Sequence, residues 1–217
     1  ALSAHYRKDE NDNTEVGAEA GGTTGERIEF NWTSFYTVKN WDFAGGIEYL
    51  QRLFDPRGPI HFGDPNQKQH DNTYSVFAES NGQLTQYLTA TLSARYDNNS
   101  EFDNAVSYRG GLSWQLNNHY TLFTSYGSAV KTPTFTERFG FFPASFIGNP
   151  NLEPETSEEW EVGVKANWKT ITGQVSVYTA DLEDEINGFI FVPEAGAFSA
   201  DNIDGDSTRE GVDLEIN

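Results

Sequence analysis

Histidines and pairs of acidic residues are the side chains in this sequence that could support catalysis. The four histidines are scattered, and no two stand at the spacing of metal ligands: His5, His61, His70 and His119. The acid pairs Glu158–Glu159 and Asp184–Glu185 are adjacent, so on a strand their carboxylates point to opposite faces and cannot share a substrate. No nucleophile elbow, phosphate-binding loop or dinucleotide fingerprint occurs. None of these patterns identifies a catalytic site.

Two acidic runs could bind a cation, DENDNTE at 9–15 and DNIDGDSTRE at 201–210. Neither fits an EF-hand loop, because the first lacks glycine at its sixth position and the second has a different oxygen spacing. Solvation of surface loops accounts for both runs, so no cofactor is expected. Calcium that orders a loop stays open as an alternative through five aspartates: Asp9, Asp12, Asp201, Asp204 and Asp206.

Aromatic residues gather in two segments that also contain proline, HFGDP at 61–65 and RFGFFPASFIG at 138–148. Exposed aromatic side chains cost free energy in water unless they bury against something. The segments are therefore either a ligand-binding rim or a collapsed loop core. The candidates for ligand contact are His61, Phe62, Phe139, Phe141, Phe142 and Phe146.

Strands are the elements that must position these loops, because apolar and polar residues alternate along most of the chain. In residues 85–96 one face carries Leu88, Ala90, Leu92, Ala94 and Tyr96, and the other carries Thr89, Thr91, Ser93 and Arg95. The same alternation predicts about ten strands, at 1–6, 24–38, 41–53, 72–80, 85–96, 104–116, 119–131, 158–168, 172–191 and 207–216. No segment combines an N-cap, a long 3.6-residue period and a glycine stop, so no helix is expected.

The predicted connections alternate in length along the chain. Tight turns are expected at Lys39–Asn40, at Asn81–Gln83, at Asn117–Asn118 and near 169–171, long loops at 7–23, 54–71 and 132–155, and a connection of medium length at 97–103. Short turns on one rim and long loops on the other are typical of an outer-membrane β-barrel.

The two faces of the predicted strands differ as a membrane barrel requires. Charged residues recur on the polar face at Glu29, Glu48, Arg95, Arg109, Glu159, Glu161, Lys165, Asp213 and Glu215. Aromatic residues stand toward the strand ends on the apolar face at Tyr96, Tyr108, Trp114, Trp160 and Trp168, as in interfacial girdles. We therefore predict an all-β, antiparallel up-and-down transmembrane barrel, and a soluble β-sandwich or a propeller fragment is the alternative.

Composition narrows the function classes further. The 217 residues carry a formal net charge of −19, which argues against a nucleic-acid partner. Mean hydropathy is −0.61, and no run of apolar residues is long enough for a transmembrane helix, but this does not exclude a barrel, whose strands give a weaker signal. The chain has no cysteine, which excludes disulfides and thiolate sites within it. It starts at Ala1 without a signal peptide, so we expect an interior piece of a longer protein.

Four segments resemble the barrel motifs of TonB-dependent outer-membrane receptors: ARYDNNSEFDNAVSYRGGLSWQL at 94–116, SYGSAVKTPTFTERFG at 125–140, GNPNLEPETSEEWEVGV at 148–164 and NIDGDSTREGVDLEIN at 202–217. They lie in the second half of the chain in the order of the family. The motif positions that we treat as structural are Asn149, Pro150, Asn151, Leu152, Pro154, Glu155 and Gly211. Within the family, the W-E that follows N-P-N-L-x-P-E most resembles the vitamin B12 (cobalamin) receptors, and siderophore receptors carry close variants.

The resemblance implies a barrel of about 22 strands, filled by an N-terminal plug that carries the TonB-contacting box. Residues 1–217 would then be a partial barrel of about ten strands within one barrel domain, with the plug domain and the C-terminal strands absent. The implied function is TonB-coupled uptake of a scarce nutrient, cobalamin-like or a ferric siderophore. No bond is made or broken in such uptake, so the resemblance implies that the protein is not an enzyme. The implied partners are TonB through the missing N-terminal part, the lipid and lipopolysaccharide of the cell outer membrane, and the nutrient.

The same resemblance orients the chain and leaves alternatives open. With the long loops outside the cell, Glu159 and Glu161 face the lumen, and loops 54–71 and 132–155 supply ligand contacts. A passive porin or channel shares the barrel without a plug. An outer-membrane hydrolase is a weaker alternative, because His119 and Ser125 lie too far apart on one strand to pair at about 3.3 Å per residue.

Overall fold

The computed structural model describes residues 1–15, 18–58, 68–140 and 145–217, which form twelve strands and one short helix. The strands are β1 (Leu2–Glu15), β2 (Ala18–Val38), β3 (Trp41–Arg57), β4 (Gln69–Thr85), β5 (Leu88–Asn99), β6 (Ala105–Gln115), β7 (Tyr120–Lys131), β8 (Glu155–Asn167), β9 (Thr172–Glu183), β10 (Ile186–Val192), β11 (Ala197–Asn202) and β12 (Ser207–Ile216), and the helix is α1 (Phe135–Phe139). Ten strands pair as one sheet in the order β1 to β9 and then β12. The predicted antiparallel up-and-down partial barrel is thereby confirmed.

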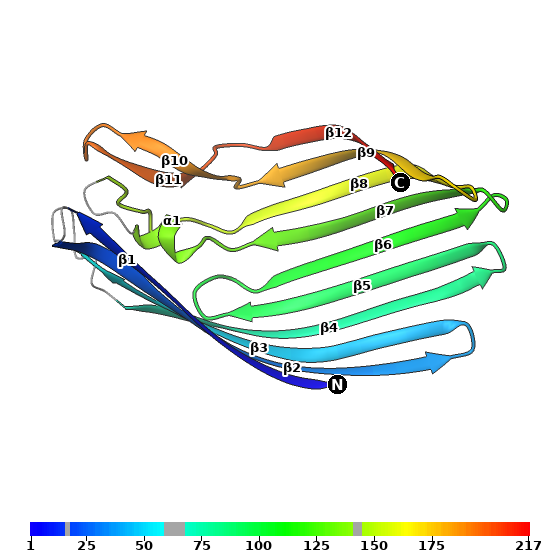
Figure 1. The fold of residues 1–217 in the computed structure, drawn as a ribbon, viewed down its shortest axis with the longest axis horizontal. Helices are drawn as coiled ribbons and strands as arrows, with labels where there is room; N and C mark the ends of the chain where they lie inside the picture. The colour runs from blue at the N-terminus through cyan, green and yellow to red at the C-terminus, as the bar shows by residue number, and fades with distance from the viewer. Residues whose placement is uncertain (16–17, 59–67, 141–144) are drawn as a thin grey trace.

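The sheet bends into an open trough with β1 and β12 at its two edges (Figure 1). Every pair in it is antiparallel. All pairs join strands that are consecutive in sequence except β9 with β12, which are separated by the hairpin of β10 and β11. The connections at 86–87, 116–119 and 168–171 lie at one end of the trough, and the longer ones at 132–154 and 184–206 lie at the other. The long loop predicted at 132–155 is thus confirmed, and most of the one predicted at 54–71 lies outside the described residues.

Three boundaries differ from the prediction. The expected loop at 7–23 is mostly a paired hairpin, in which β1 continues to Glu15 and β2 starts at Ala18. Every residue from Lys8 to Glu15 is polar, so alternation gives no signal there. The turn expected at Asn81–Gln83 lies instead at 86–87, after β4 has continued through Thr85.

The strand expected at 172–191 is two elements. β9 ends at Glu183, Asp184 takes a left-handed conformation with φ of 54°, and β10 leaves the main sheet to pair with β11. A helix that alternation did not predict, α1, begins after Thr134 with a capping box. The Thr134 backbone N–H donates to Glu137 Oε2 at 2.8 Å, and the Glu137 N–H donates to Thr134 Oγ1 at 3.2 Å.

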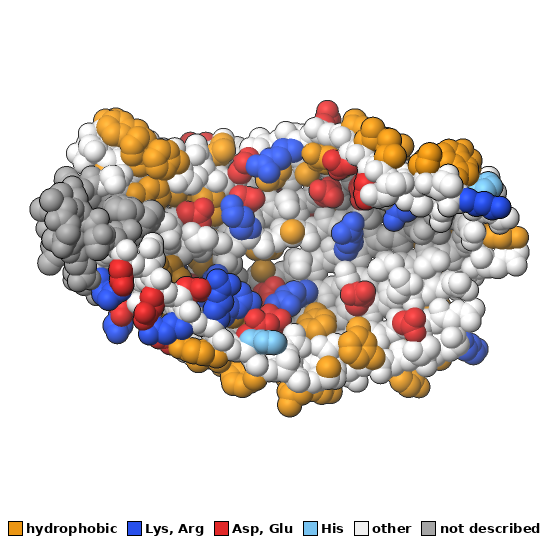
Figure 2. Space-filling model, viewed as in Figure 1, with side chains coloured by type: hydrophobic (Ala, Val, Ile, Leu, Met, Phe, Trp, Pro, Cys, Tyr) orange, Lys and Arg blue, Asp and Glu red, His pale blue; other side chains and the backbone are white. Residues whose placement is uncertain are grey.

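Large apolar side chains are exposed on the convex face of the sheet. Val162, Val177 and Leu214 retain 49%, 54% and 72% of their accessible surface, and such residues recur from β1 to β12. Charged side chains gather in the hollow, whereas hydrophobic ones follow the outer margin (Figure 2). A continuous apolar exterior of this extent marks a surface that water does not cover. Among the described residues no helix is long and apolar enough to cross a membrane.

Four aromatic rings lie across a glycine on the neighbouring strand. Each pair stands directly opposite in the register: Trp41 with Gly82, Phe77 with Gly46, Phe123 with Gly163, and Tyr178 with Gly211. A Cβ at Gly163 would lie 2.4 Å from Cζ of Phe123, and one at Gly82 would lie 2.1 Å from the Trp41 ring. These glycines are therefore seats for rings within the strands, as in aromatic rescue of strand glycines. The pair Asn81–Gly82 is a common turn signal, but here Gly82 lies within β4 and seats the Trp41 ring, so the turn predicted at this position is wrong.

Replacing Gly163 by valine should destabilise the barrel, because the new side chain takes the space of the Phe123 ring. We expect the free energy of unfolding to fall by about 1–3 kcal/mol, as for other overpacked sites. Urea titration of the full-length protein folded into lipid vesicles measures this loss. Gly25→Val is the matched control, since no atom lies within 4 Å of a Cβ built there, and an equal loss in both variants would contradict the role of the ring.

Candidate functional site

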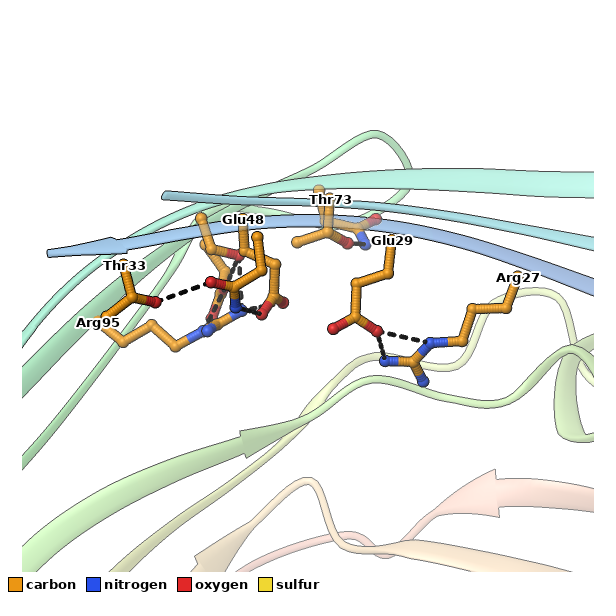
Figure 3. A network of polar contacts seen from close by, with 10 residues as sticks. Arg27, Glu29, Thr33, Glu48, Thr73 and Arg95 are labelled. Atoms are coloured by element: carbon orange, nitrogen blue, oxygen red, sulfur yellow. Dashed lines mark hydrogen bonds and ion pairs between the residues drawn. The ribbon is translucent and has the colours of Figure 1, made fainter. Parts of the chain in front are cut away.

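The concave face of β2 to β5, which we call the first wall, carries a network centred on Arg95. Nη2 of Arg95 lies 2.9 Å from Glu48 Oε1, and Nε lies 2.8 Å from Asp97 Oδ1. Arg95 also donates to the Ser75 hydroxyl at 2.6 Å. In Figure 3, Arg95 and Glu48 point from their strands into the space between the first wall and the later strands. One guanidinium therefore balances two carboxylates on the lumen side of the sheet.

Two more ion pairs complete the first wall. Arg27 Nη2 lies 2.8 Å from Glu29 Oε2 (Figure 3), and Arg52 makes a two-point contact with Asp71 across β3 and β4. Asp71 is only 2% exposed, and breaking a buried pair by removing one partner costs about 3–5 kcal/mol. The carboxylates of these pairs are thus matched by arginines on the same wall.

The concave face of β8, β9 and β12, which we call the second wall, is more acidic. A groove of about 430 Å³ there is lined by four carboxylates, from Glu155, Glu159, Glu161 and Asp213, and by one guanidinium, from Arg209. Glu161 lies 3.9 Å from Arg109, but Glu159 and Asp213 have no ion-pair partner in the part of the chain that the structure describes. Glu159 and Glu161 both line this groove on the concave face, as the resemblance implies.

The loops at the far end of the trough pack into one body. We call it the cap and define it as residues 134–140, 145–154 and 186–202. Its core contains Phe146, Leu152, Ile186 and Ala200, with Phe198 packed against them. Residues 145–147 add to β11 as a short extra strand, since Phe198 N–H donates to the Ser145 carbonyl at 2.7 Å and Ile147 N–H donates to the Phe198 carbonyl at 3.0 Å.

The N-P-N-L-x-P-E motif joins the two loops of the cap. Leu152 is 3% exposed in the core. The side chain of Asn202 accepts from Glu153 N–H at 2.9 Å and donates to the Glu153 and Asp184 carbonyls at 3.1 and 2.6 Å. Asn149 donates to Asp201 at 3.2 Å. The motif is therefore the docking point for a second loop as well as the start of β8.

Two glycines allow α1 to lie against this motif. Gly140 and Gly148 both have φ of 68°, the left-handed region that favours glycine. A Cβ on Gly148 would lie 2.4 Å from the Gly140 nitrogen. The backbone N–H of Asn149 then donates to the Glu137 carbonyl at 2.8 Å, which fixes α1 to the motif.

The structure separates the predicted ligand-contact residues. Phe146 is buried in the cap core, so the collapsed-core alternative describes it. Phe139 is half-buried against Phe135 and Arg138. His61, Phe62, Phe141 and Phe142 lie outside the described residues.

Two exposed aromatic residues that sequence analysis assigned to a membrane strand stand on the cap. Phe189 and Phe191 on β10 retain 65% and 57% of their accessible surface. Phe189 stacks on Phe198 with ring centroids 4.2 Å apart, and the Phe191 ring contacts Phe198 edge to face at 5.4 Å. Phe198 itself packs against the cap core and so supports both exposed rings. The break in alternation at Asn187–Gly188, followed by Pro193, is the signal that could have identified this hairpin.

The aspartates considered for calcium are spread over separate places. Asp9 pairs with Arg7, Asp12 pairs with Arg57, and Asp201 accepts from Asn149. Across the described residues no group of three or more histidine and acidic side chains is arranged to hold a metal. The expectation of no cofactor stays a prediction, and calcium that orders a loop stays its alternative.

The comparisons with known proteins agree with this architecture. Residues 2–217 match the family described as TonB dependent receptor-like, beta-barrel. Over 190 residues the chain is 34% identical to the vitamin B12 transporter BtuB of Vibrio vulnificus (strain YJ016), and the match covers 87% of this chain. It covers 30% of that relative, so the chain spans less than a third of its length.

Solved structures show the same fold. The siderophore receptor PirA from Acinetobacter baumannii superposes with a TM-score of 0.75 at 17% identity, over 99% of this chain and 39% of that one. The hemophore receptor HasR of Serratia marcescens, solved as a double mutant in complex with its hemophore HasA and heme, gives 0.76 at 16% identity, over 100% and 43%. At these identities the likeness establishes the fold alone.

Replacing Asn202 by alanine should loosen the cap, because three hydrogen bonds to Glu153 and Asp184 are lost together. We expect the local opening free energy at the Glu153 amide to fall by about 1–2 kcal/mol, as measured by hydrogen exchange. Asn151→Ala is the matched control, since the Asn151 side chain makes no hydrogen bond to the described residues. Equal exchange in the two variants would show that Asn202 does not hold the loops together.

The stability of the cap should also depend on pH through Glu185, which lies between β9 and β10 next to the cap. The Ser207 hydroxyl lowers the pKa of Glu185 most, and the Arg209 guanidinium also lowers it. The folded-state pKa is thus below the unfolded value of about 4.3. The stabilisation is present above that pH and is lost as pH falls through the folded pKa. We expect cleavage of the cap by pepsin to rise in that window, and Glu185→Gln to remove this pH dependence; an unchanged profile in the variant would contradict it.

Proposed function

The chain belongs to the TonB dependent receptor-like β-barrel family, and we propose that the full-length protein is an active-transport receptor of the cell outer membrane. It takes up a scarce, bulky nutrient, and TonB supplies the energy from the proton gradient of the inner membrane. No bond of the nutrient is made or broken in this process. The chain contributes part of the barrel wall and the cap at its outer end.

The opposite solvation of the two faces of the sheet carries this proposal. The convex face presents exposed apolar residues such as Val177 and Leu214, which suits the hydrocarbon of a bilayer. The concave face carries ion pairs such as Arg95–Glu48, which suit a hydrated lumen or a polar body within it. A barrel with a lumen of this kind, closed on one side by packed loops, is suited to selective passage.

We favour a cobalamin-like ligand over a ferric siderophore. The chain has a formal net charge of −19, and a strongly acidic surface disfavours the approach of an anion. Ferric catecholate complexes are anionic, whereas a corrinoid carries little net charge and many amide groups. The 34% identity to a protein named as a vitamin B12 transporter supports the same choice. Phe189 and Phe191 are the exposed rings of the cap on which a large planar ligand could stack.

The partners follow from this function. TonB would contact a segment outside this chain, and lipid and lipopolysaccharide would surround the convex face. The cap is built from the long loops at one end of the trough (Figure 1). Outer-membrane barrels have their long loops outside the cell, so we assign that end to the cell exterior. Phe139 and the loop segments 59–67 and 141–144 stay candidates for ligand contact.

A passive channel is the second candidate, because an open lumen with paired charges would also conduct ions. It differs in needing no energy source. A hydrolase has less support. His119 lies at the short-turn end, where its Nδ1 is 3.1 Å from the Asn167 carbonyl oxygen, far along the strand from the acidic groove.

Equilibrium binding to the purified full-length protein tests the proposal. We expect cyanocobalamin to bind with a Kd below about 1 μM, equivalent to about −8 kcal/mol, and ferric enterobactin to bind much more weakly. Phe189→Ala combined with Phe191→Ala should weaken cobalamin binding about tenfold or more. Tight binding of the siderophore in place of cobalamin would reverse the choice of ligand.

Uptake by whole cells separates the receptor from the channel. Labelled cyanocobalamin should accumulate in cells that have TonB and should fail to accumulate in otherwise identical cells that lack it. Uptake that is unchanged without TonB, together with steady ion conductance in a planar bilayer, would favour the passive channel.

A further inference from the structure

The cap reaches across the mouth of the trough through α1. This helix follows β7, yet its side chains contact β3, which lies four strands away in the sheet order, and the loop between β5 and β6. We propose that Phe135 and Arg138 form a releasable latch that holds the cap over the lumen, and that release of this latch opens the route from the exterior. The inference rests on the proposed receptor function and adds a conformational step to it.

Phe135 is the first contact of the latch. Its ring stacks on Phe54 of β3 with centroids 5.7 Å apart and planes 6° apart. The guanidinium of Arg52 lies 5.6 Å from the centroid of the same ring. Asp71 holds Arg52 in place from the neighbouring strand. The first wall therefore offers a preformed seat for one aromatic ring.

Arg138 is the second contact, one helical turn later. Its guanidinium carbon lies 4.8 Å from the ring centroids of both Phe102 and Phe139, and Nη2 lies 3.4 Å from Glu101 Oε2. Arg138 is 9% exposed, and its Nε–H has no hydrogen-bond partner among the residues that the structure describes. A buried cation with an unmet donor is held less firmly than one with all donors satisfied.

The cap is bonded more strongly within itself than to the first wall. Inside the cap, backbone hydrogen bonds join Phe198 to Ser145, Ile147 to Phe198 and Asn149 to Glu137. Between α1 and the first wall, by contrast, the contacts found in the described parts of the chain come from side chains alone. The cap can therefore separate from that wall without unfolding, because the side-chain contacts fail first.

The opposite side of the cap is suited to act as the hinge. Covalent connections join it there to β7, β8 and β9. Lys131 Nζ lies 3.2 Å from Glu155 Oε2, and the same oxygen accepts from Ile186 N–H at 3.1 Å. The cap would therefore pivot about the ends of these strands when Phe135 and Arg138 leave their seats.

Labelling from outside tests the latch without any transport measurement. Leu50 faces the lumen on β3, two lumen-facing positions further in than Phe54. In full-length protein in outer-membrane vesicles, with any cysteines outside this chain replaced by serine, Leu50→Cys is labelled with a membrane-impermeant maleimide. We expect Phe135→Ala to raise the labelling rate about tenfold, as the open population grows. Thr136→Ala, in the same helix but with no side-chain hydrogen bond to the described residues, should leave the rate unchanged.

Locking the latch tests its role in uptake. The chain has no cysteine, so once any cysteines elsewhere in the full-length protein are replaced by serine, Phe54→Cys with Phe135→Cys can be joined selectively by a short, reducible bifunctional thiol reagent. We expect uptake of cyanocobalamin by the joined receptor to fall at least about tenfold and to recover after reduction. Ala129→Cys with Ser157→Cys, which joins residues already paired in the sheet, is the control and should keep its uptake.

The outcomes distinguish the latch from the receptor function. Full uptake by the joined Phe54–Phe135 variant, or a labelling rate that Phe135→Ala leaves unchanged, overturns the latch. If the unjoined receptor takes up none of the nutrients, the proposed function fails, and the labelling rates still decide whether the cap opens.

Discussion

The structure depends on the rule that a backbone in contact with hydrocarbon must satisfy all its hydrogen bonds within the protein. Within the sheet the chain meets this rule, because each strand from β2 to β9 pairs with a neighbour on both sides, whereas the edge strands β1 and β12 are paired on one side in this chain. Once the ladder is continuous, the two-residue period assigns every side chain to one of two environments. Trp160 and Glu161 are adjacent in the chain, yet one faces the exterior and the other faces the lumen.

The same rule explains which parts of the fold could be predicted. Strands such as β5, β6 and β8 separate apolar from polar faces, so alternation identified them and their approximate ends. Beyond the apolar band, water reaches both faces and the contrast disappears. The hairpin of β1 and β2 beyond Arg7 and the change from β9 to β10 at Asp184 lie in this region. Alternation could not resolve them for that reason.

The cap was harder to predict because its contacts join residues that are distant in sequence. Asn202 bonds to Glu153, and Phe54 stacks on Phe135, and neither pair leaves a local pattern. The exposure of an aromatic residue in a loop also depends on which other loop covers it. Phe146 is covered by β11, whereas Phe189 is left at the surface. The motif around Pro150 marked the correct place, but its role in joining two loops required the structure.

The rings seated on glycines shape the lumen as well as the sheet. Phe77, Phe123 and Tyr178 are bulky and face inward, yet each lies across the adjacent strand where a side chain is missing. Bulk that would otherwise project into the bore is laid along its surface. At these three positions the rings therefore occupy space that a side chain on the adjacent strand would fill, and the inner surface carries less protruding bulk.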